Sequence, residues 1–199
     1  MKLSSVQHLA VHHSATPRDQ EASKALASID NNHKERLHPE TNGFGKHIAY
    51  HFVIDGKGIV HETRPLDEVG YHAGVLDVNK HSIGICLLGD FTKERPSEGQ
   101  MEALKEILAR MILFFDLKPK DVKPHRGIKS TSCPGTNLTN EMIVNLLEPL
   151  PGWGRLYEDK LIKAGVVKGK ADLDATLSRR ELYKIIVESI KRLNQENLL

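Results

Sequence analysis

The chain has 199 residues, which is long for one minimal domain and short for two full ones. Hydrophobic residues make up 39% and charged residues 27%, as in ordinary globular proteins, and no apolar run is long enough to span a bilayer. The formal net charge of +2 gives no sign of a nucleic-acid binder, so we expect neither nucleic acid nor the membrane interior as a partner.

The N-terminus and the cysteine content both indicate a chain made in the cytoplasm. Residues 1–5 lack the apolar core of a secretion signal. The chain has two cysteines, Cys86 and Cys133, and a single disulfide would be a weak framework for a protein of this length. We therefore expect reduced cysteines with separate roles.

Residues 6–62 alternate apolar stretches with turn-forming ones. The elements expected there are a strand over 6–11 that ends at His12, a helix over 22–36, a loop over 39–45, a strand over 48–54, a hairpin turn over 55–58 and a return strand over 59–62. On the helix, Ala25 and Ile29 share one side, and His33 falls with them. The end of a strand is a rigid place to hold a ligand, which makes His12 a candidate.

Residues 64–79 are expected to be mostly loop, and residues 82–88 form a continuous apolar run. Such a run predicts a central strand that is buried on both faces. Cys86 lies inside it. A buried free cysteine usually acts as a small apolar side chain, so we favour that interpretation over a reactive thiol.

Two further helices are predicted in the second half of this domain. The first is amphipathic and begins at about Pro96, with Ser97 as its N-cap. The second ends near Leu147 and is capped by Asn137 or Thr139. Strands interleaved with helices predict an α/β fold in which a mixed central β-sheet is flanked by helices.

The loop between these two helices holds a histidine and a cysteine eight positions apart, His125 and Cys133, followed by a proline and a glycine that fix a bend. Imidazole nitrogen and thiolate sulfur are ligands that zinc prefers, and His12 is the best candidate for a third ligand. Two histidines and one cysteine leave the fourth tetrahedral position open, as in catalytic zinc sites. From the residues alone, a loop cysteine with surface histidines is the alternative.

A segment with two prolines and two glycines marks the clearest boundary in the chain. We expect a first domain over 1–148, a linker over 149–155 and a small helical module over 156–199. Residues 151–199 hold ten Lys and Arg against seven Asp and Glu, so this end of the chain is its basic part. Two helices make a small core. We therefore expect the module to be stabilised by contact with the first domain, with a second copy of itself or with a ligand.

Eight short stretches of the first domain carry a resemblance to a known family. They are Val-His-His-Ser-Ala-Thr (11–16), Asn-His-Lys-Glu-Arg (32–36), Ala-Tyr-His-Phe-Val-Ile (49–54), Arg-Pro-Leu-Asp-Glu (64–68), His-Ala-Gly (72–74), Ser-Ile-Gly-Ile-Cys-Leu-Leu-Gly (82–89), Pro-His-Arg-Gly (124–127) and Thr-Ser-Cys-Pro-Gly (131–135). In this order and spacing they resemble the zinc-dependent N-acetylmuramoyl-L-alanine amidases of the phage lysozyme and peptidoglycan-recognition-protein type. The resemblance covers residues from about 6 to 147.

The resemblance implies a role for each matching residue. The implied roles are metal ligands for His12, His125 and Cys133, catalytic residues for Tyr50 and Thr131, and lining of the substrate groove for Thr16, Arg64 and His72. Thr131 would help the metal to hold the carbonyl oxygen. His13 follows His12 on an extended chain and points to the opposite side, so we do not expect it to be a ligand.

Two cysteine positions distinguish this chain from a related branch of the family. That cytosolic branch recycles cell-wall fragments, and it uses an aspartate as its third ligand and a glutamate on the central strand. Here Cys133 and Cys86 stand at those places, which argues against a recycling role. Other departures, such as Ala49 where glycine usually precedes the tyrosine, concern substrate contacts and leave the metal residues in place.

The C-terminal module resembles a single S-layer homology motif. The matching residues are 161–169 and 178–182. Such motifs usually occur in threes and bind cell-wall polymer, and a basic module would suit an anionic polymer. The alternative is a helical hairpin that only packs on the first domain.

The resemblance implies an enzyme that hydrolyses the amide between N-acetylmuramic acid and L-alanine in peptidoglycan with one Zn²⁺ ion as cofactor. We expect a phage-type endolysin that acts on the cell wall after release through a separate membrane pore, or after non-classical export. One alternative is a module that binds peptidoglycan without cutting it, although such family members lack the cysteine. A purely structural zinc site would need a fourth protein ligand, and the sequence offers no obvious one.

Overall fold

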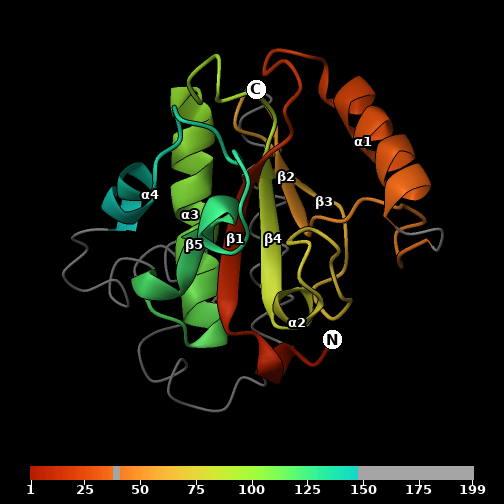
Figure 1. The fold of residues 1–199 in the computed structure, drawn as a ribbon, viewed down its shortest axis with the longest axis vertical. Coiled ribbons are helices and arrows are strands. Elements are labelled where there is room, and N and C mark those ends of the chain that lie inside the picture. The colour runs from red at the N-terminus through yellow and green to blue at the C-terminus, as the bar shows by residue number, and fades with distance from the viewer. Residues whose placement is uncertain (38–40, 148–199) are drawn as a thin grey trace, which may run out of the picture. The chain divides into compact units, whose positions relative to one another are not determined.

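The computed structural model describes residues 1–37 and 41–147. The boundary expected near residue 148, the linker over 149–155 and the helical module over 156–199 lie outside the described residues and stay predictions. Within the described ranges, the chain forms one mixed β-sheet with helices on its two sides, which confirms the predicted fold class (Figure 1).

The sheet has five strands in the order β3-β2-β4-β1-β5. The strands are β1 (His8–His13), β2 (Phe52–Ile54), β3 (Val60–Glu62), β4 (Ser82–Leu87) and β5 (Val122–Pro124). Neighbouring strands are parallel, except that β3 returns antiparallel to β2 through the predicted hairpin. The two central strands, β4 and β1, are almost wholly buried, as strands covered on both faces must be.

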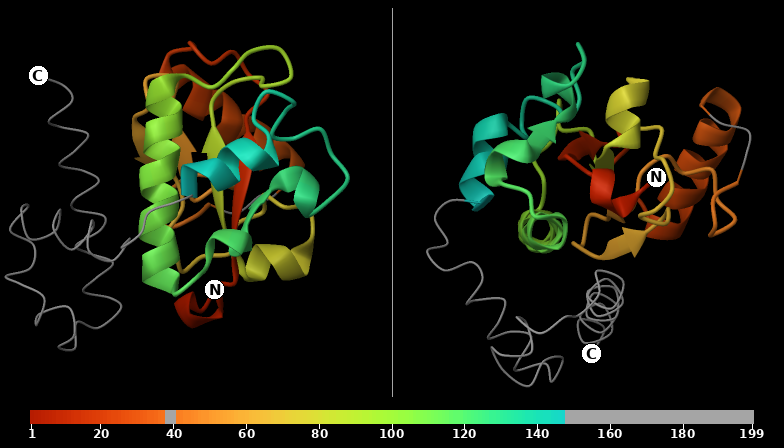
Figure 2. Two further views of the ribbon diagram at one scale, coloured as in Figure 1. Left: turned by 90° about the vertical axis from the view of Figure 1, so that its left-hand side faces the viewer. Right: turned by 90° about the horizontal axis from the view of Figure 1, so that it is seen from below.

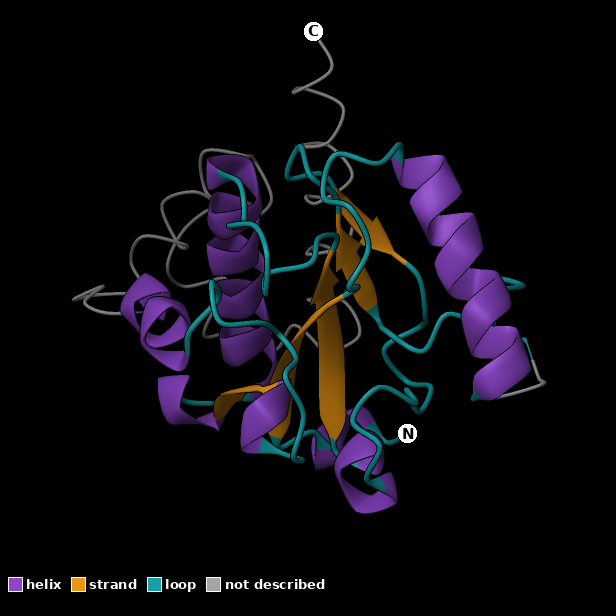
Figure 3. Ribbon diagram, turned by 45° about the horizontal axis from the view of Figure 1, so that its top comes forward, coloured by secondary structure: helices purple, strands orange, loops and turns teal. Residues whose placement is uncertain are grey.

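Four α-helices accompany this sheet in the described part of the chain. They are α1 (Ala22–Arg36), α2 (Leu76–Lys80), α3 (Glu98–Phe115) and α4 (Asn140–Leu147), and single 3-10 turns occur at Leu3–Ser5, Pro119–Asp121 and His125–Gly127. The sheet lies between α1 on one side and α3 with α4 on the other (Figure 3). Helix α4 packs beside α3 (Figure 2). No helix in the described ranges combines the length and the apolarity that crossing a bilayer requires.

Both helices predicted in the second half of the domain begin at side-chain caps. Ser97 Oγ accepts a hydrogen bond from the Gln100 N–H at 3.1 Å, and Gln100 Oε1 accepts one from the Ser97 N–H at 3.1 Å. This reciprocal pair is a capping box, and it confirms Ser97 as the N-cap of α3. For α4 the cap is Thr139, whose Oγ1 accepts from the Met142 N–H at 3.1 Å.

The structure corrects two of the predicted elements. The strand expected over 48–54 is regular only from Phe52, because the Ala49 N–H is bound by the side chain of His33, at 3.0 Å, instead of by a neighbouring strand. Helix α2 forms where loop was expected. It is only five residues long, too short for the apolar spacing that reveals a helix in a sequence.

The apolar face of α1 packs on the sheet beside the predicted buried cysteine. Ala25 and Ile29 of the helix join Val53 and Cys86 of the strands in one buried cluster, with Tyr50 packed against its edge. Cys86 has no exposed surface, so the prediction of a buried, core-forming thiol is confirmed.

Candidate metal centre

The candidate site lies where β1 and β5 end. The two strands are parallel, with Val11 opposite Pro124, so the residues that follow, His12 and His125, come to the same edge of the sheet. The loop after β5 then returns past β1. It brings Cys133 Sγ within 3.4 Å of the backbone N–H of His13, which donates to it.

The geometry of the three predicted ligands fits a zinc ion. One candidate ligand atom from each of His12, His125 and Cys133 lies within 4.8 Å of the other two. Cys133 Sγ and His12 Nδ1 are 3.8 Å apart. Zinc bonds of about 2.0–2.3 Å in a tetrahedron give ligand separations of about 3.4–3.8 Å, so the group needs only a small contraction. Among the described residues, these three form the one group of His, Cys, Asp or Glu side chains close enough together to hold a metal ion.

Hydrogen bonds on the far side of each imidazole determine which nitrogen faces the site. His12 Nε2 lies 3.1 Å from His72 Nδ1, and His125 Nε2 donates to the carbonyl oxygen of Ala73 at 3.1 Å. Both histidines therefore turn Nδ1 toward Cys133. In metal sites, the ring nitrogen of a ligating histidine that faces away from the metal usually makes a hydrogen bond of this kind.

Burial keeps the three candidate ligands uncharged in the metal-free protein. Burial lowers the pKa of His12 well below its ordinary value, with the neighbouring His72 and His125 adding to the shift, and burial also lowers the pKa of His125. Both imidazoles are thus neutral, as metal ligands must be. Burial raises the pKa of the Cys133 thiol to about 11, against the opposing effects of the His13 N–H and of Arg126. A bound cation would therefore displace the thiol proton.

Contacts within the loop fix the position of Cys133. Its carbonyl oxygen accepts from the Arg126 N–H at 2.9 Å, and its own N–H donates to Thr131 Oγ1 at 3.2 Å. Gly135 adopts a φ of +95°, and a Cβ there would lie 2.3 Å from the backbone of Phe91, so only glycine fits. The guanidinium of Arg126 donates to the carbonyl oxygens of Gly135 and Leu138 and closes the loop.

The two predicted catalytic residues lie beside the candidate ligands. The ring centroid of Tyr50 is 5.2 Å from that of His12 and also 5.2 Å from that of His33. Burial, with Cys86 and Cys133 nearby, raises the pKa of the Tyr50 phenol well above its ordinary value, so it stays protonated. Thr131 already accepts from Cys133, which leaves its hydroxyl proton to donate. The catalytic roles of both residues stay predictions.

Of the three residues expected to line a substrate groove, two are buried. Arg64 is 4% exposed, and its guanidinium donates to the carbonyl oxygens of Ile48 and Val69. His72 is 6% exposed and lies behind His12. Both side chains have little exposed surface, and their expected place in the substrate groove stays a prediction. Thr16 is half-buried, with its hydroxyl 2.6 Å from that of Ser14, and its role stays a prediction.

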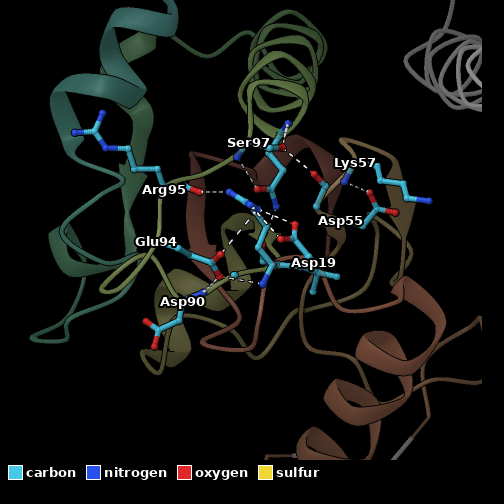
Figure 4. Close-up of polar contacts among 12 residues, drawn as sticks. Asp19, Asp55, Lys57, Asp90, Glu94, Arg95 and Ser97 are labelled. Atoms are coloured by element: carbon cyan, nitrogen blue, oxygen red, sulfur yellow. Dashed lines mark hydrogen bonds and ion pairs between the residues drawn. The ribbon is translucent and has the colours of Figure 1, made fainter.

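The loops that follow β1, β2 and β4 are joined by polar contacts near this edge of the sheet (Figure 4). Glu94 Oε1 accepts from the backbone N–H groups of Arg18, at 2.9 Å, and of Asp90, at 3.2 Å. Ser97 Oγ donates to the carbonyl oxygen of Gly56 at 2.8 Å. These contacts hold the surroundings of the site without contributing a side chain to it.

Sequence reasoning missed the residues that support the site from behind. His33 accepts from the Ala49 N–H, next to Tyr50, and Ser82 lies 3.4 Å from the ring of His72. The signal for His33 was its place among apolar residues at helical spacing. For Ser82, the signal was its place at the start of the family stretch over 82–89, since the apolar run around it gives none.

Known proteins resemble this chain in sequence and in fold. Residues 2–136 match the family described as N-acetylmuramoyl-L-alanine amidase. The N-acetylmuramoyl-L-alanine amidase of Sus scrofa is 32% identical over 134 residues, which are 66% of this chain but only 22% of that protein. Peptidoglycan-recognition protein 1 of Holotrichia diomphalia is 30% identical over 141 residues, 69% of this chain and 68% of that protein. Among solved structures, N-acetylmuramoyl-L-alanine amidase LysC from Clostridium intestinale URNW has a TM-score of 0.60 and 27% identity, and the match covers 75% of this chain and 90% of that one.

Proposed function

The chain belongs to the N-acetylmuramoyl-L-alanine amidase family, and from this premise we propose that it is a zinc-dependent amidase that cuts peptidoglycan between N-acetylmuramic acid and L-alanine. The observation that carries the proposal is the convergence of His12, His125 and Cys133, whose ligand atoms lie within 4.8 Å of one another. This donor set suits zinc and leaves one coordination position for water or substrate.

The proposed reaction adds one water molecule across the amide and gives a carboxylate on the lactyl group and a free amine on L-alanine. A bound zinc ion would supply an acidified water and a Lewis acid for the carbonyl. The protein's own residues stabilise the negative charge that develops on the carbonyl oxygen. Tyr50 keeps its phenol proton at neutral pH, and the Thr131 hydroxyl has a proton to give, so both act as hydrogen-bond donors.

The second candidate function is binding of peptidoglycan without cleavage. It is favoured by relatives that are named for recognition, such as peptidoglycan-recognition protein 1 of Holotrichia diomphalia. Cys133 supports the enzyme instead, because its thiol completes the candidate ligand group.

The test is digestion of purified peptidoglycan by the whole chain, with mass analysis of the fragments. We expect release of stem peptides with a free N-terminal alanine, loss of the activity with a chelator, and recovery when zinc is restored. Cys133→Ser should lose both zinc and cleavage. Tyr50→Phe should keep its zinc and cleave on the order of 100-fold more slowly, because one donor to the carbonyl oxygen is gone.

Two outcomes would decide against this assignment. Cleavage that survives complete removal of zinc would refute the metal-dependent mechanism. A zinc-loaded protein that binds peptidoglycan and releases no peptide would establish the binding module instead.

We further propose that the basic C-terminal segment, residues 156–199, binds an anionic polymer of the cell wall, and that the protein acts there as a phage-type endolysin after release from the cytoplasm. The excess of Lys and Arg over Asp and Glu in residues 151–199 supports this idea, as does the resemblance to a single S-layer homology motif.

A further inference from the structure

We propose that His72 is a positioning residue that holds His12 in the tautomer and orientation in which Nδ1 can bind the metal. The inference deepens the proposed function and rests on the metal site assigned above. It gives His72 a place behind the metal centre, in agreement with its burial, and no direct contact with substrate.

The argument begins with the direction of three consecutive hydrogen bonds. Ser82 Oγ lies 2.6 Å from the carbonyl oxygen of Val78, which can only accept, so the serine proton is used there. The oxygen of Ser82 is then the acceptor for His72 Nε2, 3.4 Å away. His72 therefore carries its proton on Nε2 and leaves Nδ1 without one.

The bare Nδ1 of His72 lies 3.1 Å from His12 Nε2 and accepts its proton. A neutral imidazole has one proton, so placing it on Nε2 of His12 leaves Nδ1 with a free lone pair. That nitrogen lies 3.8 Å from Cys133 Sγ, on the metal side. The Val78 carbonyl thus sets the tautomer of His12 through two intervening side chains.

The ring of His72 has no room to turn away from His12. A Cβ at Gly84, opposite the ring on β4, would lie 2.5 Å from His72 Cδ2, and a Cβ at Gly70 would lie 2.7 Å from the same atom. The ring of His51 closes a further side, with its centroid 5.9 Å away in an edge-on arrangement. Two positions without side chains therefore form a cradle that fits this imidazole.

Ala73, the residue after His72, orients His125, the second candidate histidine ligand. The carbonyl oxygen of Ala73 accepts from His125 Nε2 at 3.1 Å, and the Ala73 N–H donates to the buried side chain of Asn79 at 2.8 Å. Two consecutive residues thus orient both candidate histidine ligands, and α2 anchors them. If His72 only filled space in the core, its hydrogen bond to one candidate ligand would be unrelated to the hydrogen bond between Ala73 and the other.

The test compares His72→Asn with His72→Leu in the whole chain. Asparagine keeps an acceptor oxygen near the place of Nδ1, whereas leucine fills the space and offers none. Zinc affinity is measured by competition with a chromogenic chelator, and thermal unfolding of the metal-free protein is measured in parallel. We expect leucine to weaken zinc binding by about 10- to 100-fold, and asparagine by no more than about threefold.

The two measurements separate positioning from packing. If His72 served only the core, the smaller, polar asparagine would do more damage than leucine in both assays. Positioning predicts opposite rankings: leucine gives the higher melting temperature and asparagine the tighter zinc binding. His47→Asn is the matched control, because this buried histidine lies beside Asp30 of α1 and forms no part of the cradle around His72. It should lower the melting temperature and leave zinc affinity unchanged.

Zinc binding by the leucine variant as tight as in the wild type would overturn the inference, and so would equal losses in both His72 variants. A wild-type protein that binds no zinc would overturn this inference together with the proposed mechanism. A third outcome would refute only the proposed activity. In it, the wild-type protein binds zinc and His72→Leu weakens that binding as expected, but the wild-type protein cuts no peptidoglycan.

Discussion

At the scale of single residues, the site depends on buried histidines that stay neutral. Burial lowers the pKa of both His33 and His51 to about 4, and each accepts a backbone N–H on Nδ1, from Ala49 and Gly84 respectively. Protonation of either Nδ1 would put a hydrogen on the atom that now accepts the backbone N–H, and the two hydrogens would then face each other. These two residues therefore make the domain sensitive to acid although they touch no candidate ligand.

The first prediction concerns His33. Its pKa is 6.5 in the unfolded chain and about 4 in the folded domain, so between these values the unfolded chain binds more protons. Stability is then fully present above pH 6.5 and declines as the pH falls toward 4, by up to about 1.4 kcal/mol per pH unit for this one group.

The His33→Asn variant tests it, because asparagine keeps an acceptor for Ala49 and cannot titrate. Urea unfolding of the zinc-free protein at several pH values should show a shallower decline for the variant over this range. Parallel pH profiles for variant and wild type would show that another group carries the effect.

From the sequence, the predictable part of the candidate site is the set of residues whose chemistry is visible in their type and order. Two histidines and a cysteine near turn-forming residues predicted the group that the structure brings together. The depth of a side chain below the surface is not visible in a sequence: Arg64 and His72, which are predicted to line a groove, are 4% and 6% exposed. Whether a polar side chain faces solvent or a neighbouring ligand depends on packing between strands and loops far apart in the chain.

At the scale of elements, the second prediction concerns Gly84 in the middle of β4. The backbone there is extended, so alanine would be acceptable on conformational grounds. Its Cβ would, however, lie 2.5 Å from the ring of His72. We expect Gly84→Ala to cost about 1–3 kcal/mol of unfolding free energy, as overpacked cores do, and to weaken zinc binding as the ring is displaced.

Gly127→Ala is the matched control for this change. A Cβ at position 127 would meet nothing closer than 3.7 Å, so urea unfolding should detect a difference of no more than about 0.5 kcal/mol. Equal stability of the two variants would mean that the ring of His72 moves aside freely, which the cradle does not allow.

The predicted elements succeeded where a strong local pattern exists. Helix α1 matches its predicted bounds, and α3 begins at the predicted cap, because apolar spacing and capping residues are local features. The predicted strand over 48–54 failed at its first half, since a histidine from α1 takes the Ala49 N–H. That contact joins residues 16 positions apart, and no local pattern reports it.

At the scale of the whole molecule, the third prediction concerns the basic C-terminal segment. Residues 1–147 contain the five described strands of the sheet and the three candidate ligands. A chain truncated after Leu147 should therefore fold, as judged by circular dichroism, and bind zinc like the whole chain. It should lose most of its binding to purified cell walls, because it lacks the segment in which Lys and Arg exceed Asp and Glu.

Wall binding is best measured by co-sedimentation at two salt concentrations. Binding that depends on the segment should weaken as salt screens the charges. A truncated chain that sediments with the walls as well as the whole chain would assign the binding to the first domain and leave the segment without this role.

The order of strands and candidate ligands along the chain has a consequence for the time at which the ligand group forms during synthesis. His12 is among the first residues made, and Cys133 follows 121 positions later. At roughly 5–20 residues per second, the ribosome needs about 6–24 s between them. Strand β1 also cannot pair until its two neighbours in the sheet, β4 and β5, have been made, because both come later in the chain. A nascent chain thus lacks the third candidate ligand until Cys133 has been made, so the ligand group comes together only when the first domain is nearly finished.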